Sequence, residues 1–494
     1  MSTEREASLF IDGKWVHAAD GGTRDIVNPA DGSVVAVVDE AGHTDAAAAV
    51  AAARAAFDSG EWRGTPVAER AALLDRIADL LMRDRDQIAH VETLDTGKTL
   101  KESYIDVDDV VSVFRYYARL VAVESDRLVD VGDPTVISRV VREPIGVCVL
   151  IAPWNYPLLQ ISWKIAPALA AGCTMVAKPS EVTPLSTIAL VRLAEEAGVP
   201  AGVLNLIQAS GAAVGTALTD TPDVDLISFT GGASTGVAIA RAAAPHVTRV
   251  ALELGGKNPH IVFADAEWKS AVDAVVTGVF MHSGQVCSSG TRLIVEESIA
   301  EKFVAELVVR AGEIRFGDGL DPRSQTGPLV SMAHRAKVES HVEQAMSEGA
   351  ELVAGGQRPT GPEFAAGSYY PPTIFDHCER SMRIVQEETF GPILTVERFT
   401  TEQQAIELGN DTSYGLAAGV RTADTGRAER VARALRHGTV WVNEFGIYTP
   451  AAEWGGFGKS GNGRELGPTG LAEYQELKHI WTNTSPKEVD WFCD

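Results

Sequence analysis

Two glycine-containing segments carry the candidate catalytic residues of this 494-residue chain. Cys287 lies in HSGQVCSSGTR, where glycine, glutamine and serine replace the apolar residues typical of a core. A thiol in such a turn is a candidate nucleophile, although a lone cysteine is more often a small buried apolar residue. Glu253, in LELGGKNPHIVF, lies at the end of an apolar strand, which makes it a candidate general base. A salt-bridged or solvent-facing glutamate is the alternative.

Three further polar residues follow predicted strands. Asn155, in APWNYPLLQ, could donate a hydrogen bond to a developing oxyanion, or it could hold a turn. Lys178 and Glu181, in VAKPSEVTP, could approach a ribose or a phosphate, and a carboxylate at Glu181 would repel a 2′-phosphate. Two solvated loop residues are the simpler interpretation. The segment FTGGASTG, residues 229–236, opens a helix directly after a strand, which suits a phosphate at the helix N-terminus.

Alternating strands and helices must position these residues. Between residues 146 and 256, short apolar runs such as GVCVLIAP, CTMVAKP and RVALELGG alternate with helical patterns. This order predicts a parallel sheet with helices on both faces, whose ligands bind beyond the carboxyl ends of the strands. A second block of strands and helices extends from about 260 to 450. RLVDVGDPTVISRVVRE and ELKHIWTNT fit neither block and are typical of a projecting hairpin arm and its partner strand.

Composition excludes several classes of function. Lys and Arg number 43 and Asp and Glu 67, a net charge of −24, which argues against nucleic-acid binding and against docking on an anionic membrane. The five cysteines are widely spread, which disfavours a disulfide framework or a zinc ribbon, and we expect no metal site. We find no run of about 18 apolar residues and no secretory pattern in MSTEREASLF. The sequence therefore predicts a cytoplasmic protein without a membrane span.

The order of these motifs resembles the NAD(P)-dependent aldehyde dehydrogenase superfamily. The blocks ALELGGKNPHIVF, GQVCSSGTRL and QEETFGPIL follow one another as in that family, and the resemblance extends from LFIDGKWV near the start to GKSGNGRELG near the end. It implies an α/β fold with two doubly wound parallel-sheet domains, a small β oligomerisation arm, and a homotetramer built as a dimer of dimers. The implied divisions are 1–124, 146–254 and 455–474 for the NAD-binding domain, 255–454 for the catalytic domain, and 125–145 and 475–494 for the arm and tail.

The resemblance also implies a mechanism. Cys287 attacks the aldehyde carbon, and the Asn155 side chain and the Cys287 backbone N–H hold the oxyanion of the thiohemiacetal. Hydride transfer to the nicotinamide leaves a thioester, and Glu253 activates the water that hydrolyses it. Lys178 completes the implied catalytic set.

NAD is the implied cofactor. Ile151, Trp154, Lys178 and Glu181 match the adenosine side of the family's site. Its phosphate turn and nicotinamide side are matched by Gly231, Gly236, Leu254, Glu388 and Phe390. Gly232 departs from the family, because many members have serine after the first glycine of the turn, so one phosphate contact is lost or replaced.

The resemblance also implies a class of substrate. WNYPLLQISWKIAPALAAGCT and ELGPTGLAEYQELKHIWTNTSPKEVDWF resemble the branch of the family that oxidises betaine aldehyde to glycine betaine. Tyr156, Trp163 and Trp454 match aromatic positions of that branch's tunnel, where cation–π attraction holds a trimethylammonium group. Met281 occupies a position that is often Trp or Phe, and Tyr448 could replace the missing ring. A small cationic aldehyde is therefore the expected partner, with core packing as the alternative role of the aromatic residues.

The same sequence features fit other activities. ω-Aminoaldehydes such as 4-aminobutyraldehyde or 4-trimethylaminobutyraldehyde are the alternative substrates, because Asp106 and Asp109 share a helix face that lies near the substrate entrance in related enzymes. A solvated helix face is the simpler interpretation of these two residues. CoA-acylating relatives generally lack the glutamate at position 253, and retention of the four catalytic residues argues against a non-catalytic scaffold. A cysteine hydrolase would need a histidine such as His282 beside Cys287.

Overall fold

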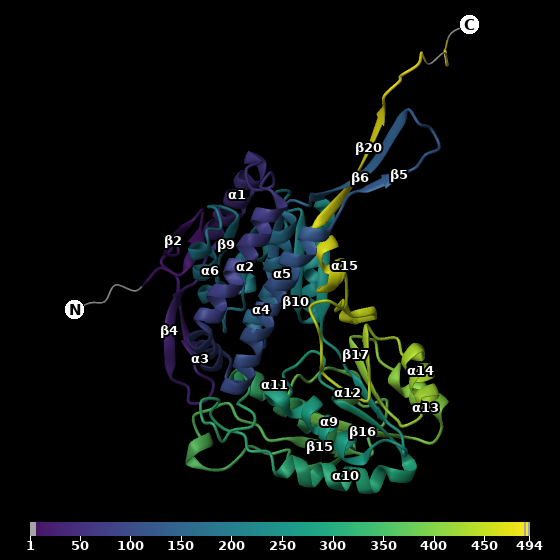
Figure 1. Ribbon diagram of the computed structural model, residues 1–494. Helices are drawn as coiled ribbons and strands as arrows, with labels where there is room; N and C mark the ends of the chain where they lie inside the picture. The colour runs from purple at the N-terminus through teal and green to yellow at the C-terminus, as the bar shows by residue number, and fades with distance from the viewer. Residues whose placement is uncertain (1–5, 489–490, 493–494) are drawn as a thin grey trace, which may run out of the picture.

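The computed structural model describes residues 6–488 and 491–492 (Figure 1). Parts of the predicted segments 1–124 and 475–494, and Cys493, lie outside the described residues. The described chain builds two large sheets, one above the other in Figure 1, with a hairpin arm that projects from the upper one. The predicted α/β class with two mainly parallel sheets and an arm is therefore confirmed.

The first sheet has eight strands within the described residues, and its five central strands are parallel. In spatial order they are β19 (Gly461–Asn462), β11 (Arg249–Leu254), β10 (Leu226–Gly231), β7 (Val147–Ile151), β8 (Thr174–Lys178), β9 (Leu204–Leu206), β1 (Leu9–Ile11) and β2 (Lys14–Val16). The predicted strands of this block are all present. One detail differs from prediction, because Lys178 is the last residue of β8 and does not follow it, whereas Glu253 lies next to the last residue of β11, at the predicted strand end.

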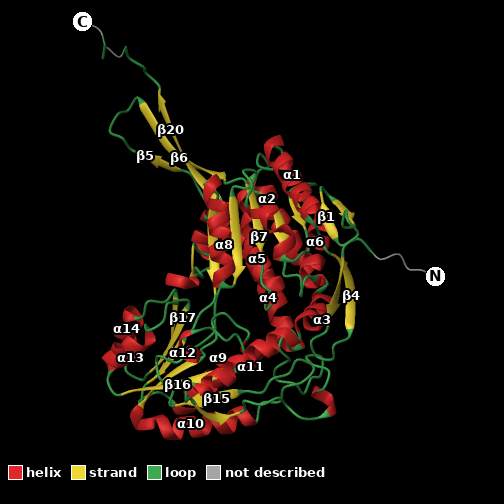
Figure 2. Ribbon diagram, turned by 180° about the vertical axis from the view of Figure 1, so that it is seen from behind, coloured by secondary structure: helices red, strands yellow, loops and turns green. Residues whose placement is uncertain are grey.

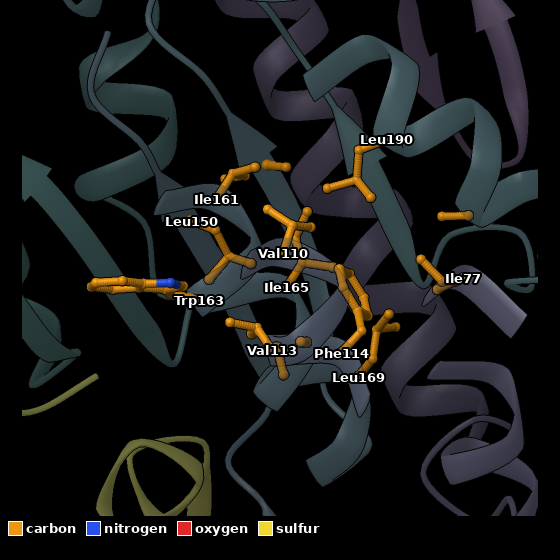
Figure 3. Close-up of a cluster of buried hydrophobic side chains, with 14 of the residues drawn as sticks. Ile77, Val110, Val113, Phe114, Leu150, Ile161, Trp163, Ile165, Leu169 and Leu190 are labelled. Atoms are coloured by element: carbon orange, nitrogen blue, oxygen red, sulfur yellow. The ribbon is translucent and has the colours of Figure 1, made fainter. Parts of the chain in front are cut away.

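Helices cover both faces of this sheet because successive strand residues point to opposite sides. Val147 and Val149 pack with α1 (His43–Ser59), α7 (Gly211–Thr219) and α8 (Ala233–Ala243). Cys148 and Leu150 pack in a cluster with α2 (Val67–Arg83), α4 (Leu100–Val123), α5 (Pro157–Ala171) and α6 (Leu185–Ala197) (Figure 3). α3 (Arg85–Thr96) lies between α2 and α4 in the chain. All fifteen residues of α5 are buried, and Gly172 ends this helix in the left-handed conformation.

The second sheet has seven strands in the described chain, and all but the edge strand β14 run parallel. Their spatial order is β14 (Glu351–Ala354), β15 (Thr373–Asp376), β16 (Ile393–Phe399), β13 (Arg292–Glu296), β12 (Pro259–Val262), β17 (Ala417–Arg421) and β18 (Thr439–Val442). α9 (Trp268–Phe280) and α10 (Glu297–Gly312) cover one face, and α13 (Glu402–Gly409) and α14 (Thr425–Ala434) the other (Figure 2). α11 (Met332–Ser347) and α12 (Arg383–Gln386) pack on β15 and β16.

The arm is a three-stranded antiparallel sheet that joins distant parts of the chain. β5 (Arg127–Val129) and β6 (Val136–Pro144) form the predicted hairpin, and β20 (Gln475–Asn483) pairs with β6 along its whole length. The segment between the second sheet and the arm adds β19 to the first sheet and places α15 (Gly467–Ala472) against α5. The predicted domain boundaries remain a proposal with which these pairings agree.

The remaining elements are short. β3 (Thr23–Val27) and β4 (Val34–Asp39) form a two-stranded sheet, and single 3-10 turns are η1 (Ala244–His246), η2 (Met281–Gly284), η3 (Pro362–Phe364) and η4 (Gly458–Ser460). None of the described helices combines the length and the apolarity needed to cross a bilayer. In the same residues no group of three or more His, Cys, Asp or Glu side chains is placed to hold a metal ion.

Candidate active site

A cavity of about 190 Å³ lies between the two sheets and brings together part of the predicted site. Its walls contain the predicted residues Trp154, Asn155, Gly231, Gly232, Leu254, Cys287, Glu388 and Phe390. Six further wall residues were not predicted: Pro153, Gln160, Thr230, Gly255, His334 and Lys337. His334 and Lys337 lie on α11, three residues apart on a helix whose sequence is otherwise that of an ordinary surface helix, so no local signal marked them.

The turn that carries Cys287 is held in an unusual backbone conformation. His282, Ser283 and Gly284 have φ values of 47°, 53° and 70°, which are strained for the two residues with side chains. A side chain at Gly284 would meet the carbonyl oxygen of Gly391 at 2.1 Å, so glycine is required there. The Asn258 side chain donates hydrogen bonds to the carbonyl oxygens of Cys287 (2.8 Å) and Ser289 (3.0 Å). Asn258, also missed in the sequence, thus fixes the position of the thiol.

The Cys287 thiol is half-buried and poorly ionised. Burial, followed by the nearby carboxylates of Glu253 and Glu388, raises the pKa of Cys287 to about 12, although two backbone N–H groups oppose the shift. A thiol with this pKa is protonated at neutral pH, and its nucleophilic form requires a base.

Glu253 is the candidate base for the Cys287 thiol. It is fully buried, and burial followed by the charge of Glu465 raises its pKa well above the usual range. Its Oε1 has no hydrogen-bond partner among the described residues. Lys164 opposes the shift, and its Nζ donates to Glu465, to Thr230 Oγ1 (2.8 Å) and to Ser228 Oγ (3.2 Å). A buried carboxylate with a free oxygen can accept a proton from a thiol or a water.

Asn155 connects the first sheet to the catalytic turn. It follows β7 and precedes α5, and its Nδ2 donates to the carbonyl oxygen of Gln285, two residues before Cys287, at 2.9 Å. Its own carbonyl oxygen lies 2.9 Å from His282 Nε2. His282 is therefore used to tie Asn155 to the turn, and burial lowers its pKa well below the usual range, which makes it a poor partner for a hydrolase-type cysteine.

The cofactor candidates form two groups. Gly231 ends β10 and Gly232 caps α8, and a side chain at Gly232 would meet nothing within 4 Å, so ligand atoms could approach its N–H closely. Gly236 has a different role, because a side chain there would meet Leu254 at 2.8 Å and push α8 from β11. Ile151 and Lys178 are the last residues of β7 and β8, Glu181 lies in the loop after β8, and all three are outside the cavity walls.

Burial shifts the pKa of two charged cofactor-binding candidates, Lys178 and Glu388. Lys178 is buried, which lowers its pKa, and its Nζ donates only a long 3.4 Å hydrogen bond to the Pro179 carbonyl oxygen within the described residues. Burial raises the pKa of Glu388 to about 7, and its Oε1 accepts a hydrogen bond from the Gly256 N–H at 3.0 Å. Phe390 has φ 60° and packs edge-to-face against Trp154 at 5.2 Å.

The substrate candidates do not line this cavity. Trp163 and Trp454 are buried in the core cluster, with their ring centroids 6.1 Å apart. The Tyr448 ring packs on Trp163 with a centroid distance of 5.3 Å. Tyr448 and Tyr156 are both half-buried. Met281 is 38% exposed and lines a second cavity, of about 560 Å³, beside α4, α9 and α10. Core packing thus accounts for the two tryptophans, and the two tyrosines are the members left partly open.

The interpretation of Asp106 and Asp109 as a solvated helix face is wrong. Asp106 is only 4% exposed, and the Nζ of Lys98 lies 2.5 Å from its Oδ2. Asp109 is half-buried and accepts a hydrogen bond from the Tyr448 hydroxyl at 2.6 Å. The sequence carried no signal for the Lys98 pair, because Lys98 lies outside both helices, in the short segment between α3 and α4.

Comparison with known proteins decides the family. The family model described as "Aldehyde dehydrogenase family" matches residues 15–480. The chain belongs to the aldehyde dehydrogenase family. This confirms the resemblance drawn from the motifs, and with it an enzyme of this family's fold.

Individual relatives narrow the comparison within the aldehyde dehydrogenases. A betaine aldehyde dehydrogenase of Bacillus subtilis (strain 168) is 54% identical over 98% of this chain and 99% of its own length. Aminoaldehyde dehydrogenase 1, peroxisomal, of Pisum sativum is 41% identical over 99% of this chain and 98% of its own. The crystal structure of a Staphylococcus aureus betaine aldehyde dehydrogenase in complex with NAD⁺ superposes with a TM-score of 0.98, at 49% identity, over 99% of this chain and 98% of that one.

Proposed function

We propose that this aldehyde dehydrogenase oxidises betaine aldehyde to glycine betaine with NAD. The observation that supports the substrate best is the half-buried aromatic pair Tyr156 and Tyr448, which packs against the same core cluster as Cys287. Aromatic faces attract a trimethylammonium group without needing hydrogen bonds from it. The 54% identity to a betaine aldehyde dehydrogenase over nearly the whole chain supports the same substrate.

In the proposed reaction the Cys287 thiol loses its proton to Glu253 and attacks the aldehyde carbon. The oxyanion of the thiohemiacetal then accepts hydrogen bonds from the Asn155 amide and the Cys287 backbone N–H, for which the Asn155 amide must turn from the Gln285 carbonyl oxygen. Oxidation of this adduct leaves a thioester on Cys287. Glu253, once it has released the thiol proton to solvent, takes a proton from the attacking water, and the thiolate of Cys287 leaves.

The residues present fit an NAD cofactor. Lys178 has a buried amino group with one weak partner, which a ribose hydroxyl would complete, and the open N-terminus of α8 at Gly232 suits a diphosphate. The nicotinamide side of the cofactor would be held by Glu388 and Phe390. The rest of the cofactor site would be shaped by Trp154, Ile151, Gly231, Gly236 and Leu254. Bound NAD⁺ would supply the acceptor for the hydride that leaves the substrate carbon. Glu181 favours NAD over NADP by repulsion of a 2′-phosphate.

We also propose that the protein is a homotetramer and that it works in the cytoplasm. Exposed apolar residues on the arm, including Leu128, Ile137, Leu477 and Trp481, support a homotetramer in which the arms join subunits. Cys148, Cys173 and Cys378 are buried free thiols, which supports a reducing compartment such as the cytoplasm.

Product analysis tests the proposed function. The purified chain is incubated with betaine aldehyde and NAD⁺, with and without coenzyme A, and the products are identified by mass spectrometry. We expect glycine betaine and NADH in equal amounts under both conditions. Formation of a coenzyme A thioester, or NADH without glycine betaine, would overturn the proposal.

A further inference from the structure

The turn before Cys287 keeps two residues in a backbone conformation that side chains disfavour. His282 and Ser283 have φ values of 47° and 53°, in the left-handed region that favours glycine, and both are buried. Such strain persists only where the surrounding contacts enforce it. The contacts that hold these two residues therefore decide how the turn presents Cys287.

Two other segments of the chain hold this pair by hydrogen bonds. The His282 N–H donates to Glu102 Oε1 at 2.8 Å, and the Ser283 N–H donates to Thr326 Oγ1 at 2.8 Å. The Ser283 hydroxyl also donates to the Gly327 carbonyl oxygen at 2.5 Å. Glu102 provides the one charged acceptor of these three, and hydrogen bonds to ionised acceptors are the stronger kind. Glu102 is therefore the main restraint on the turn.

The same carboxylate also caps the start of α4. Glu102 Oε2 accepts hydrogen bonds from the Thr99 N–H at 2.8 Å and from the Thr99 hydroxyl at 2.7 Å. The Glu102 N–H donates to Thr99 Oγ1 at 3.3 Å, which completes a capping box. One side chain thus joins the N-terminus of α4 to the strained turn.

His282 transmits this restraint to the proposed oxyanion site. Its Nε2 lies 2.9 Å from the Asn155 carbonyl oxygen, and since a carbonyl oxygen only accepts, the imidazole is the donor. The Asn155 side chain donates to the carbonyl oxygen of Gln285, two residues before Cys287, at 2.9 Å. Glu102 therefore fixes the backbone of His282, and the ring of His282 fixes Asn155.

We propose that Glu102 is a positioning residue for the oxyanion site and that it acts through His282. Its carboxylate holds the left-handed turn so that the Asn155 amide and the Cys287 N–H converge on one point. The inference rests on the proposed roles of Asn155 and Cys287 but not on the choice of aldehyde. A displaced donor weakens binding of the transition state more than binding of the aldehyde, so loss of the restraint lowers kcat and leaves KM nearly unchanged.

Glu102→Gln in the full-length enzyme separates the two tasks of this side chain. A glutamine oxygen can still accept from the two donors of Thr99, and its amide group then faces the His282 N–H, from which it cannot accept. We expect kcat to fall about tenfold for betaine aldehyde and for acetaldehyde, with KM within about twofold of the wild type. The value of kcat is expressed per NAD⁺-binding site, counted by calorimetric titration, so that misfolded enzyme does not contribute.

Thr99→Ala is the matched control, because it removes the capping hydroxyl and leaves the contact between Glu102 and the His282 N–H. We expect this variant to have a lower melting temperature than the wild type and a kcat within about twofold of it.

His282→Asn tests the proposed route. Asparagine adopts the left-handed conformation more readily than histidine and lacks the ring that contacts Asn155. Adding Glu102→Gln to His282→Asn should therefore lower kcat by less than about threefold, because coupled residues do not act additively.

The outcomes separate this inference from the proposed function. A wild type that oxidises acetaldehyde but not betaine aldehyde contradicts the proposed substrate, and acetaldehyde then still decides the role of Glu102. Three results would each overturn that role: a kcat of Glu102→Gln within about twofold of the wild type, an equal loss of kcat in Thr99→Ala, or a full tenfold loss on adding Glu102→Gln to His282→Asn.

Discussion

At Cys287 the structure combines a thiol and a carboxylate, Glu253, whose pKa values are both raised. Burial raises the pKa of Cys287 to about 12 and moves that of Glu253 upward as well. The raised pKa makes the Glu253 carboxylate a stronger base, so transfer of the thiol proton to it costs less free energy than transfer to an ordinary carboxylate. This pairing gives two predictions about single residues.

The first concerns the pH dependence of the thiol. Because the folded-state pKa of Cys287 lies far above that of an ordinary cysteine, its thiolate fraction should grow about tenfold per pH unit from pH 7 to 10. The rate of alkylation by iodoacetamide, followed at Cys287 by mass spectrometry, should rise accordingly without levelling off. A plateau below pH 9 would show that the thiol is activated in the free enzyme.

The second concerns Glu253. Replacement by glutamine keeps the shape and removes the base, so we expect kcat to fall by about 10²-fold or more. Rapid-mixing experiments should then show slow NADH formation already in the first turnover, because the Cys287 thiol also loses its proton acceptor. Glu267→Gln, at the exposed N-cap of α9, is the control. A kcat within twofold of the wild type would remove Glu253 from the mechanism.

At the scale of elements, buried charge holds α3 and α4 together. Lys98 follows α3 and is enclosed by Glu92 from α3 and Asp106 from α4. Removing its ammonium group would leave two buried carboxylates without a cation, which costs about 3–5 kcal/mol.

Lys98→Met should therefore lower the free energy of unfolding by about 3–5 kcal/mol, measured by urea denaturation. The exposed Lys101 on α4 offers a matched control, since Lys101→Met should change stability by less than about 0.5 kcal/mol. Equal effects of the two variants would mean that the Lys98 ion pairs are not a stabilising unit.

The sequence predicted elements better than contacts. The strands from 147 to 254 and the β5–β6 hairpin with its β20 partner could be recognised because apolar runs and turn residues are local signals. Asn258, His334 and Lys98 could not, because their roles arise from neighbours more than a dozen residues away or from a loop's path. The same limit explains the error at Asp106, whose helix spacing alone fitted a solvated face.

At the scale of the whole molecule, the arm exposes apolar side chains that nothing in the described part of a single chain covers. Leu477 is 66% and Trp481 56% exposed on β20, and Figure 1 shows this strand standing away from both sheets. Apolar side chains so exposed are typical of an interaction surface.

Substitution of both residues by glutamate should therefore dissociate the proposed homotetramer, which sedimentation velocity would detect as a smaller species. Val309→Glu, at an equally exposed apolar position on α10, should leave the assembly unchanged. A tetramer that survives the arm substitutions would place the contacts elsewhere, and a monomeric wild type would contradict the assembly.

The central claim is that the site selects a quaternary ammonium aldehyde. It is tested most directly by comparing kcat/KM, with NAD⁺, for betaine aldehyde and for its uncharged isostere 3,3-dimethylbutanal. The two differ only in replacement of the cationic nitrogen by carbon, so shape is held constant. Cation–π attraction of about 2 kcal/mol predicts a preference of about 30-fold for betaine aldehyde. Equal values, or faster oxidation of the neutral aldehyde, would contradict the account.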